Sequence, residues 1–211
     1  MKHIFEDIYR EPNHAPWTRE IPFKKLVEFV KKGIIKPCRA LDLGCGEGYE
    51  SQFLAEQGFD VVGIDLSERA MGYAKKNAPT VDFRALDIIN DDLSSLGKFN
   101  FAFEKGVIHC LPFDQKKVYV QRVASLLNSN ATFMEVTFSV NSTKSGNPGE
   151  KVRSTNNNFP LYLSTLDELK ELYSPYFEIL DAHEDSYLGK HLANLLLLKR
   201  KYIYSRLILY Y

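Results

Sequence analysis

Glycine alternates with other residues in the segment LDLGCGEG, which spans residues 41–48. Gly44, Gly46 and Gly48 stand between an apolar stretch and a stretch with helical periodicity. Repeated glycine lets a ligand approach the backbone closely, and the helix that follows presents unpaired N–H groups and the positive end of its dipole. The segment therefore predicts a turn that holds a ligand against the main chain.

Two common nucleotide-binding patterns do not fit this turn. The dinucleotide fingerprint G-x-G-x-x-G needs glycine where this chain has Tyr49, and a bulky side chain argues against close packing of a pyrophosphate. The P-loop pattern also fails, because no G-K-[ST] follows the glycines. A different nucleoside-like ligand is therefore expected.

Two carboxylates stand where the next two expected strands end. Asp65 follows the run at 60–64, and Asp87 closes the run at 81–86. Either aspartate alone could cap a helix. Because they join the glycine turn at three successive strand ends, contact with one shared ligand is the favoured interpretation.

Strands and helices alternate along the chain and would position these residues. Gly58 is placed to end the helix after the glycine turn, and Ser67 is placed to cap the next one. Thr165 and Glu168 form a capping box, T-x-x-E. The expected strands lie at 38–43, 60–64, 81–86, 100–103, 131–138, 177–183 and 192–199, and the expected helices at 22–32, 47–57, 67–78, 115–127 and 165–173.

This alternation predicts an α/β fold, with a doubly wound, mostly parallel seven-stranded sheet in three αβα layers. Residues 1–211 are expected to form a single domain with its core at 37–200. Two segments break the alternation, 1–36 and the polar stretch 139–164, and both are interpreted as lids. The second follows the fifth strand, so it lies at the carboxyl edge of the sheet, where such folds bind ligands. Residues 201–211 are expected to be a C-terminal extension.

The segment D-x-G-x-G-x-G at 42–48 resembles the first motif of the class I S-adenosylmethionine-dependent methyltransferases. GIDLS at 63–67, LDI at 86–88 and FNFAFEKGVIHCL at 99–111 are similar to the ends of the second, third and fourth strands of that family. The resemblance covers about 38–138 well and the later helix and strands loosely. It implies a Rossmann-like methyltransferase fold with S-adenosylmethionine as cofactor.

The resemblance also implies roles for single residues. Asp65 would bind both ribose hydroxyls, because a carboxylate can accept two hydrogen bonds from a cis-diol. Asp87 would meet the adenine amino group, and Ile88 would pack on the ring. Asp42 would orient the turn or the ammonium of the methionine part, and Cys45 is expected to be a small packed residue. The implied cofactor-binding set is Asp42, Gly44, Cys45, Gly46, Gly48, Asp65, Leu66, Asp87, Ile88 and Glu104.

The implied activity is methyl transfer to a small molecule by in-line displacement, in which the protein mainly positions the acceptor and excludes water. The segment APWT at 15–18 is similar to one that lines a small acceptor pocket in the thiol, thiopurine and tellurite-resistance branch. Trp17 and Phe159 are therefore expected to bind the acceptor, although Trp17 could instead pack against a helix. A thiol acceptor needs little help, because its pKa of about 8.5 leaves it partly ionised at neutral pH.

His109 and Glu104 are the titratable groups expected nearest the methyl group, and either could accept a proton. His109 could instead be a loop contact, and Glu104 could face the sulfonium or the loop backbone. Lys105 is expected to be solvated or to attract an anionic acceptor. DNA and amide methylases carry N/D-P-P-[YF] where this chain has EKGVIH at 104–109, which argues against chemistry on nucleobase amines.

Composition restricts the partners further. Lys plus Arg and Asp plus Glu both number 27, so a broad attraction to nucleic acid or anionic membrane is not indicated. Cys38, Cys45 and Cys110 are odd in number and widely spaced, which fits neither a disulfide framework nor a metal site. The first residues lack a signal-peptide core, and the apolar run at 192–198 is too short to span a bilayer. A cytoplasmic protein with a small-molecule partner and no metal is expected, in an oligomeric state that the sequence does not indicate.

Two alternative functions stay open. The chain could bind S-adenosylmethionine as a regulatory or interaction module without turnover. It could also be a protein or RNA methyltransferase that docks its substrate on the strip KRKYIYSR at 199–206. Residues 202–211 are rich in aromatic and apolar side chains and could cover a core edge or a dimer partner.

Overall fold

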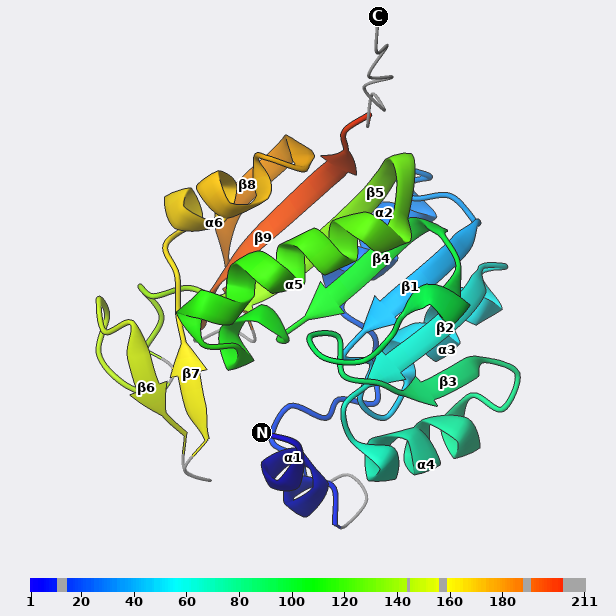
Figure 1. Cartoon of the computed structure of the whole chain (residues 1–211), viewed down its shortest axis with the longest axis horizontal. Coiled ribbons are helices and arrows are strands. Elements are labelled where there is room, and N and C mark those ends of the chain that lie inside the picture. Colours follow the sequence, from blue (N-terminus) through cyan, green and yellow to red (C-terminus); the bar gives the residue numbers. More distant parts are fainter. Residues whose placement is uncertain (11–14, 144, 156–158, 188–190, 203–211) are drawn as a thin grey trace, which may run out of the picture.

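The computed structural model describes residues 1–10, 15–143, 145–155, 159–187 and 191–202. Within these residues, seven strands form one sheet in the order β3-β2-β1-β4-β5-β9-β8 (Figure 1). The first five strands of this order pair in parallel, and β9 runs antiparallel to both of its neighbours. The predicted α/β fold is confirmed, and its topology is Rossmann-like. The strands are β1 (Arg39–Leu43), β2 (Asp60–Asp65), β3 (Asp82–Ala85), β4 (Phe99–Lys105), β5 (Leu127–Phe138), β8 (Phe177–Tyr187) and β9 (His191–Arg200).

Helices cover both faces of the sheet. Phe29 of α2, Leu54 of α3 and Met71 of α4 are buried in one apolar cluster. Tyr119 of α5 and Leu169 of α6 are buried in a second cluster, on the face that Figure 1 turns toward the viewer. No helix in the described ranges is long and apolar enough to cross a membrane. The helices are α1 (Lys2–Ile8), α2 (Lys24–Lys31), α3 (Tyr49–Glu56), α4 (Glu68–Asn77), α5 (Phe113–Leu126) and α6 (Leu166–Tyr173), with short 3₁₀ turns η1 (Ser94–Leu96) and η2 (Ile108–Cys110).

Local signals set several helix ends where the sequence predicts them. Ser67 Oγ accepts a hydrogen bond from the backbone N–H of Ala70 at 3.1 Å and caps α4. Thr165 and Glu168 form the expected reciprocal capping box at the start of α6. Gly58 follows α3 with a φ of +88°, a conformation that glycine adopts without strain. These predicted boundaries are confirmed.

The lid segments contain elements that the sequence does not predict. Helix α1 has no side-chain cap and is held by tertiary contacts. Lys2 pairs with Glu68 at 2.9 Å, and the Glu6 carboxylate accepts from the Glu68 backbone N–H at 2.6 Å. In the second lid, β6 (Val152–Ser154) and β7 (Pro160–Tyr162) form an antiparallel hairpin. Such short elements leave no periodicity for a sequence to show.

Strands β4 and β5 extend beyond their predicted limits. β4 continues to Lys105, and β5 begins at Leu127, directly after α5. Both strands are central and pair on two sides, and this pairing extends regular structure past the apolar core of each segment. Glu104 and Lys105 consequently belong to a strand, and their side chains point to opposite faces of the sheet.

Candidate active site

A cavity of about 800 Å³ lies at the carboxyl ends of the parallel strands. Strand-end residues form one wall, and residues of α1, of 15–19 and of 139–164 form the other. In Figure 1 the arrowheads of β1 and β4 point toward α1 and the β6–β7 hairpin across this edge. Small-molecule sites commonly have volumes of about 300–1,000 Å³. Both segments interpreted as lids therefore border a site of suitable size.

The glycine turn after β1 reaches the cavity through Gly44. The backbone N–H groups of Gly44 and Cys45 donate to the carbonyl of Ile64 at 2.8 and 3.1 Å, which ties the turn to β2. Gly44 has a φ of +65°, and a Cβ there would lie 2.3 Å from Cγ2 of Val107. Only glycine fits this close approach.

The other residues of the glycine turn do not line the cavity but pack against residues behind its wall. Cys45 is buried, as expected for a small packed residue. A Cβ on Gly46 would lie 2.8 Å from the hydroxyl oxygen of Tyr9, and one on Gly48 would lie 2.8 Å from Cζ of Phe83. Neither Cys45 nor these two glycines line the cavity.

Asp42 lies beneath the turn. Its Oδ2 accepts a hydrogen bond from Ser51 Oγ at 2.6 Å, and the residue is only 2% exposed. Burial raises the pKa of Asp42 to about 7. Of the two predicted roles for Asp42, this geometry favours orientation of the turn, because the carboxyl group fastens β1 to α3 and does not line the cavity.

Asp65 ends β2 with its carboxylate at the cavity wall. Oδ2 accepts from the backbone N–H of Gly46 at 3.0 Å, and Oδ1 accepts from that of Ser67 at 2.9 Å. Burial raises the pKa of Asp65, whereas these two N–H groups favour its charged form. An ionised carboxylate offers about four acceptor positions, so acceptor capacity remains beside these contacts. The chemistry of this carboxylate at the cavity wall is therefore compatible with a ligand that carries hydroxyl groups, such as the nucleoside part of S-adenosylmethionine.

Asp87 organises the turn after β3. Its Oδ1 accepts from the backbone N–H of Ile89 at 2.8 Å, and its Oδ2 accepts from Asn90 Nδ2 at 2.8 Å. Asp87 lines the cavity together with its neighbours Leu86 and Ile88. The carboxylate therefore combines a local turn contact with a place at the site, and Oδ2 keeps acceptor capacity.

Glu104 is fully buried on the α5 side of the sheet, beneath the loop that follows β4. Its Oε1 accepts hydrogen bonds from the backbone N–H groups of Val107 and, at 3.4 Å, of Ile108. Burial raises the pKa of Glu104 to about 7. The side chain does not line the cavity, whereas Val107 does. The structure thus separates Glu104 from the acceptor space and places it against the loop backbone, one of the two positions predicted for it.

His109 lines the cavity and is 8% exposed. Its Nδ1 accepts a hydrogen bond from the backbone N–H of Phe138 at 3.2 Å and lies 2.9 Å from Oγ1 of Thr137. The imidazole stacks on the Phe138 ring, with centroids 4.9 Å apart and planes 22° apart. Burial, and then the nearby charge of Lys116, lowers the pKa of His109 to about 3.

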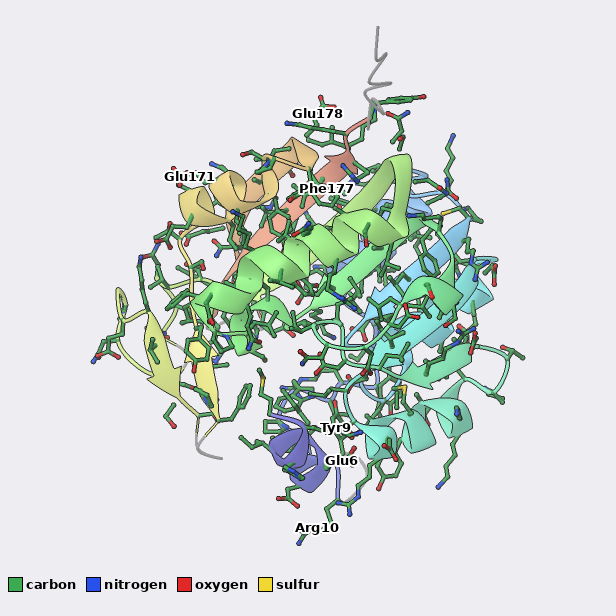
Figure 2. The ribbon with its side chains drawn as sticks, in the orientation of Figure 1. Glu6, Tyr9, Arg10, Glu171, Phe177 and Glu178 are labelled. Carbon is green, nitrogen blue, oxygen red and sulfur yellow. The ribbon has the colours of Figure 1, made fainter. Side chains whose placement is uncertain are left out.

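Aromatic side chains from both lids meet over the cavity. The ring of Phe5 lies 6.0 Å from the ring of Trp17 and 5.1 Å from that of Phe159. Trp17 Nε1 donates to the Tyr9 hydroxyl at 2.7 Å. In Figure 2, Tyr9 lies on the side of α1 that faces the molecule, and Arg10 points away from it. Trp17 therefore contacts α1, a helix that the sequence does not predict, and also lines the cavity.

Phe5 and Tyr9 were missed by reasoning from the sequence. Phe5 belongs to a seven-residue helix without a side-chain cap, and Tyr9 follows directly after that helix; nothing in the spacing of these residues marks one side as facing a ligand. Lys105 differs from expectation too: it lines the cavity and forms a partly buried ion pair with Glu50, so it is not a solvated side chain. Strand alternation could have given this orientation only if the end of β4 had been known.

Arg153 braces the second lid from inside. Its guanidinium donates to the carbonyl of Ser142 at 2.6 Å and to that of Val140 at 2.5 Å. Its Nε donates to the carbonyl of Glu150 at 3.0 Å, and the residue is buried. One side chain thus fixes three points of the main chain between β5 and β6.

Comparison with known proteins identifies the family. The family described as "Methyltransferase domain" matches residues 34–188. A 2-heptyl-1-hydroxyquinolin-4(1H)-one methyltransferase of Mycobacteroides abscessus is 27% identical over 149 residues, which are 65% of each chain. A probable thiol methyltransferase of Arabidopsis thaliana is 24% identical over 144 residues, which are 66% of this chain and 64% of that protein. The match thus spans less than two thirds of either relative's length.

The fold comparison agrees. A structure of Burkholderia thailandensis 1,6-didemethyltoxoflavin-N1-methyltransferase, with bound 1,6-didemethyltoxoflavin and S-adenosylhomocysteine, superposes with a TM-score of 0.74. It is 22% identical and covers 95% of this chain and 87% of its own. At this identity the likeness shows a shared fold. With the family match over most of the sheet and the strand-end site in place, the chain belongs to the class I S-adenosylmethionine-dependent methyltransferases.

Proposed function

We propose that this chain transfers a methyl group from S-adenosylmethionine to a small-molecule acceptor, a thiol or a similar nucleophile, by in-line displacement. One observation carries the proposal: a single cavity is lined both by the strand-end residues Gly44, Asp65 and Asp87 and by aromatic side chains of the two lids. Cofactor and acceptor would then share one enclosed space, which is what direct transfer requires.

The strand ends would hold the cofactor. Asp65 accepts from the ribose hydroxyls through the acceptor capacity that its backbone contacts leave. Asp87 offers Oδ2 to the adenine amino group, and Leu66 and Ile88 supply apolar surface beside the base. Gly44 lets the methionine part lie against the main chain. Bound S-adenosylmethionine supplies an electrophilic methyl group, so the chain's own residues mainly orient the acceptor and exclude water.

The other wall of the cavity favours a small, largely apolar acceptor. Phe5, Trp17 and Phe159 close over this part of the site. Names of related proteins support the same class: one is a methyltransferase of a hydroxyquinolone, one is named a probable thiol methyltransferase, and one holds 1,6-didemethyltoxoflavin. An acceptor that ionises readily suits this site, because Glu104 is separated from the cavity and the pKa of His109 is too low for it to gain a proton near neutral pH.

The alternative of a docking strip for protein or RNA receives less support. Arg200, the central base of KRK at 199–201, is buried and donates to the carbonyls of Ala124 and Tyr176, each at 2.9 Å. It is therefore a structural brace and does not present its charge to a partner. Residues 203–206 of the strip, and all but Tyr202 of the cover expected at 202–211, lie outside the described residues.

Cofactor binding and methyl transfer can be tested one after the other. S-adenosylmethionine and S-adenosylhomocysteine are expected to raise the melting temperature, whereas NAD is not. A radiolabelled methyl assay should then place label on a thiol or a phenol in a panel that also holds carboxylates, amines, peptides and RNA. Label found on peptide or RNA alone would overturn the small-molecule assignment. Binding without any transfer would favour the module without turnover, and absence of binding would remove the cofactor assignment.

A further inference from the structure

The hydrogen bonds of His109 determine which ring nitrogen carries the proton. The backbone N–H of Phe138 donates to Nδ1 at 3.2 Å. A main-chain N–H can only donate, so Nδ1 must present its lone pair. The Thr137 hydroxyl, 2.9 Å from the same nitrogen, can rotate to donate there as well. In the neutral imidazole the proton therefore sits on Nε2.

Nε2 lies beside Gly106, which lines the cavity together with His109. A Cβ on Gly106 would lie 3.3 Å from Cε1 and 3.5 Å from Nε2 of His109, and both residues line the cavity. Among the described residues, no group hydrogen-bonds to Nε2, and protein atoms do not enclose it. Stacking on Phe138 fixes the ring plane. An N–H donor without a protein partner is thus held toward the acceptor space.

The surroundings also keep the ring from gaining a second proton. His109 is buried, and the ammonium of Lys116 lies close by, held by the carbonyl of Tyr162 at 2.6 Å and by Ser164 Oγ at 2.9 Å. Both effects lower the pKa of His109. A neutral ring whose one proton occupies Nε2 has no lone pair there with which to take a proton from the acceptor.

We propose that His109 donates a hydrogen bond through Nε2–H to the methyl acceptor, and that the acceptor binds already ionised. This inference rests on the proposed function and narrows its substrate class to small molecules with an acidic nucleophile, such as an aromatic thiol or an acidic heteroaromatic hydroxyl. The apolar aromatic wall suits the ring of such a molecule, and Nε2–H compensates for the loss of water around its anion.

The proton balance of the step follows from this arrangement. The acceptor loses its proton to water before it binds. Its anion then forms the bond to the methyl carbon, and the electron pair of the broken carbon–sulfur bond stays on the cofactor's sulfur. The product and the demethylated cofactor are neutral at the reacting atoms, so no group in the site has to take up a proton.

Ring nitrogen spectroscopy tests the donor state directly. The chain contains five histidines, and ¹⁵N-histidine labelling with His109→Gln as the reference identifies the signal of His109. In the complex with S-adenosylhomocysteine, His109 should show an unprotonated Nδ1 and a protonated Nε2 that do not change between about pH 5.5 and 8.5. An unprotonated Nε2, or a ring that titrates in this range, would overturn the proposal.

Kinetics with substituted benzenethiols test the role toward the acceptor. A glutamine amide reaches about as far as Nε2 and can donate but cannot act as a base, whereas an asparagine amide reaches only Nδ1. His109→Ala and His109→Asn should lower kcat/KM about 10- to 100-fold, and His109→Gln should stay within about 5-fold of the unmodified enzyme. His183→Gln, on β8 and away from the cavity lining, is the matched control and should have no effect. Equal losses for the Gln and Ala variants would point to a base and contradict the proposal.

The pH profile separates this inference from the proposed function. The rise of kcat/KM with pH should follow the solution pKa of each thiol and move when the thiol is changed. A rise fixed at one pKa for all thiols would reveal a base in the protein and overturn the inference while leaving methyl transfer intact. An enzyme that methylates no acceptor would overturn the proposed function, and the ring spectrum would still decide the donor state of His109.

Discussion

The rings of Phe5 and Phe159 lie 5.1 Å apart and cross at 61°, so helix α1 meets the second lid directly over the cavity. The two residues come from segments that are far apart in the sequence. An edge-to-face contact of this kind contributes about 0.5–1.5 kcal/mol beyond the area that it buries. If the two segments act as lids, closure of the site would depend on this contact, and each segment can be tested by itself.

Phe5→Ala should lower kcat/KM for the acceptor by about 3- to 10-fold, because the lids lose this contact and admit water. Affinity for S-adenosylhomocysteine should fall less, since Asp65 and Asp87 belong to the opposite wall. Steady-state kinetics and titration calorimetry measure the two effects. Val152→Ala changes an exposed position of the β6–β7 hairpin and should leave both quantities unchanged. A loss confined to cofactor affinity would contradict the lid role.

Asp65→Asn should weaken binding of S-adenosylhomocysteine by about 100-fold. The variant loses the charge and replaces one acceptor oxygen with a donor, which would face the N–H of Gly46 or Ser67. Calorimetry provides the dissociation constants. Asp60→Asn is the control, because Asp60 is exposed at the opposite end of the same strand. An unchanged affinity in Asp65→Asn would exclude the proposed ribose contact.

Gly46→Ala should destabilise the fold by about 1–3 kcal/mol, because alanine resists a φ of +53° and its Cβ would lie 2.8 Å from the Tyr9 hydroxyl. Tyr9→Phe removes that oxygen, so the double variant should be less destabilised than the sum of the two single changes. Urea unfolding of the four proteins of the cycle measures the coupling. Additive changes in the free energy of unfolding would mean that the Tyr9 hydroxyl is not in steric contact with position 46.

Because several buried carboxyl groups have raised pKa values, we expect the free energy of unfolding to fall as pH rises. Burial raises the pKa of Asp42 and of Glu104 to about 7 and that of Glu135 well above its usual range. Between the ordinary pKa of about 4 and the raised one, the folded state holds protons that the unfolded chain has released, so unfolding becomes easier as pH increases. For Glu104 alone, the free energy of unfolding above neutral pH would be about 3 kcal/mol lower than in acid.

Free energies of unfolding at pH 5.5 and 7.5 provide the check. Glu104→Gln should show a smaller drop between these two conditions than the unmodified protein, because its neutral amide does not titrate. Glu56→Gln, at an exposed position of α3, should keep the full drop. A Glu104→Gln variant with the same pH dependence as the parent would show that this carboxyl group is not perturbed.

Elements with local signals were predictable from the sequence. Three helix boundaries follow from the residue types of Ser67, Thr165 and Gly58. The alternation of strands and helices predicts the strand-end positions of Gly44, Asp65 and Asp87. The cofactor roles of these residues stay predictions, although the cavity brings Gly44, Asp65 and Asp87 together.

Features that depend on distant contacts were not predictable. Helix α1 is held by Glu68, and Tyr9, which follows the helix, is oriented by Trp17. The inward position of Glu104 depends on where β4 ends, which the residue types of FNFAFEK do not mark. The hydrogen bond from the Phe138 N–H to His109 joins residues of different elements and has no counterpart in residue spacing.

The guanidinium of Arg153 also has a consequence for motion. Because it fastens the carbonyls of Val140, Ser142 and Glu150 together, these three points of the main chain would move together and not independently. Substrate entry and product release would then both require this part of the second lid to move away from the cavity, and the rate of turnover would depend on how often it does so.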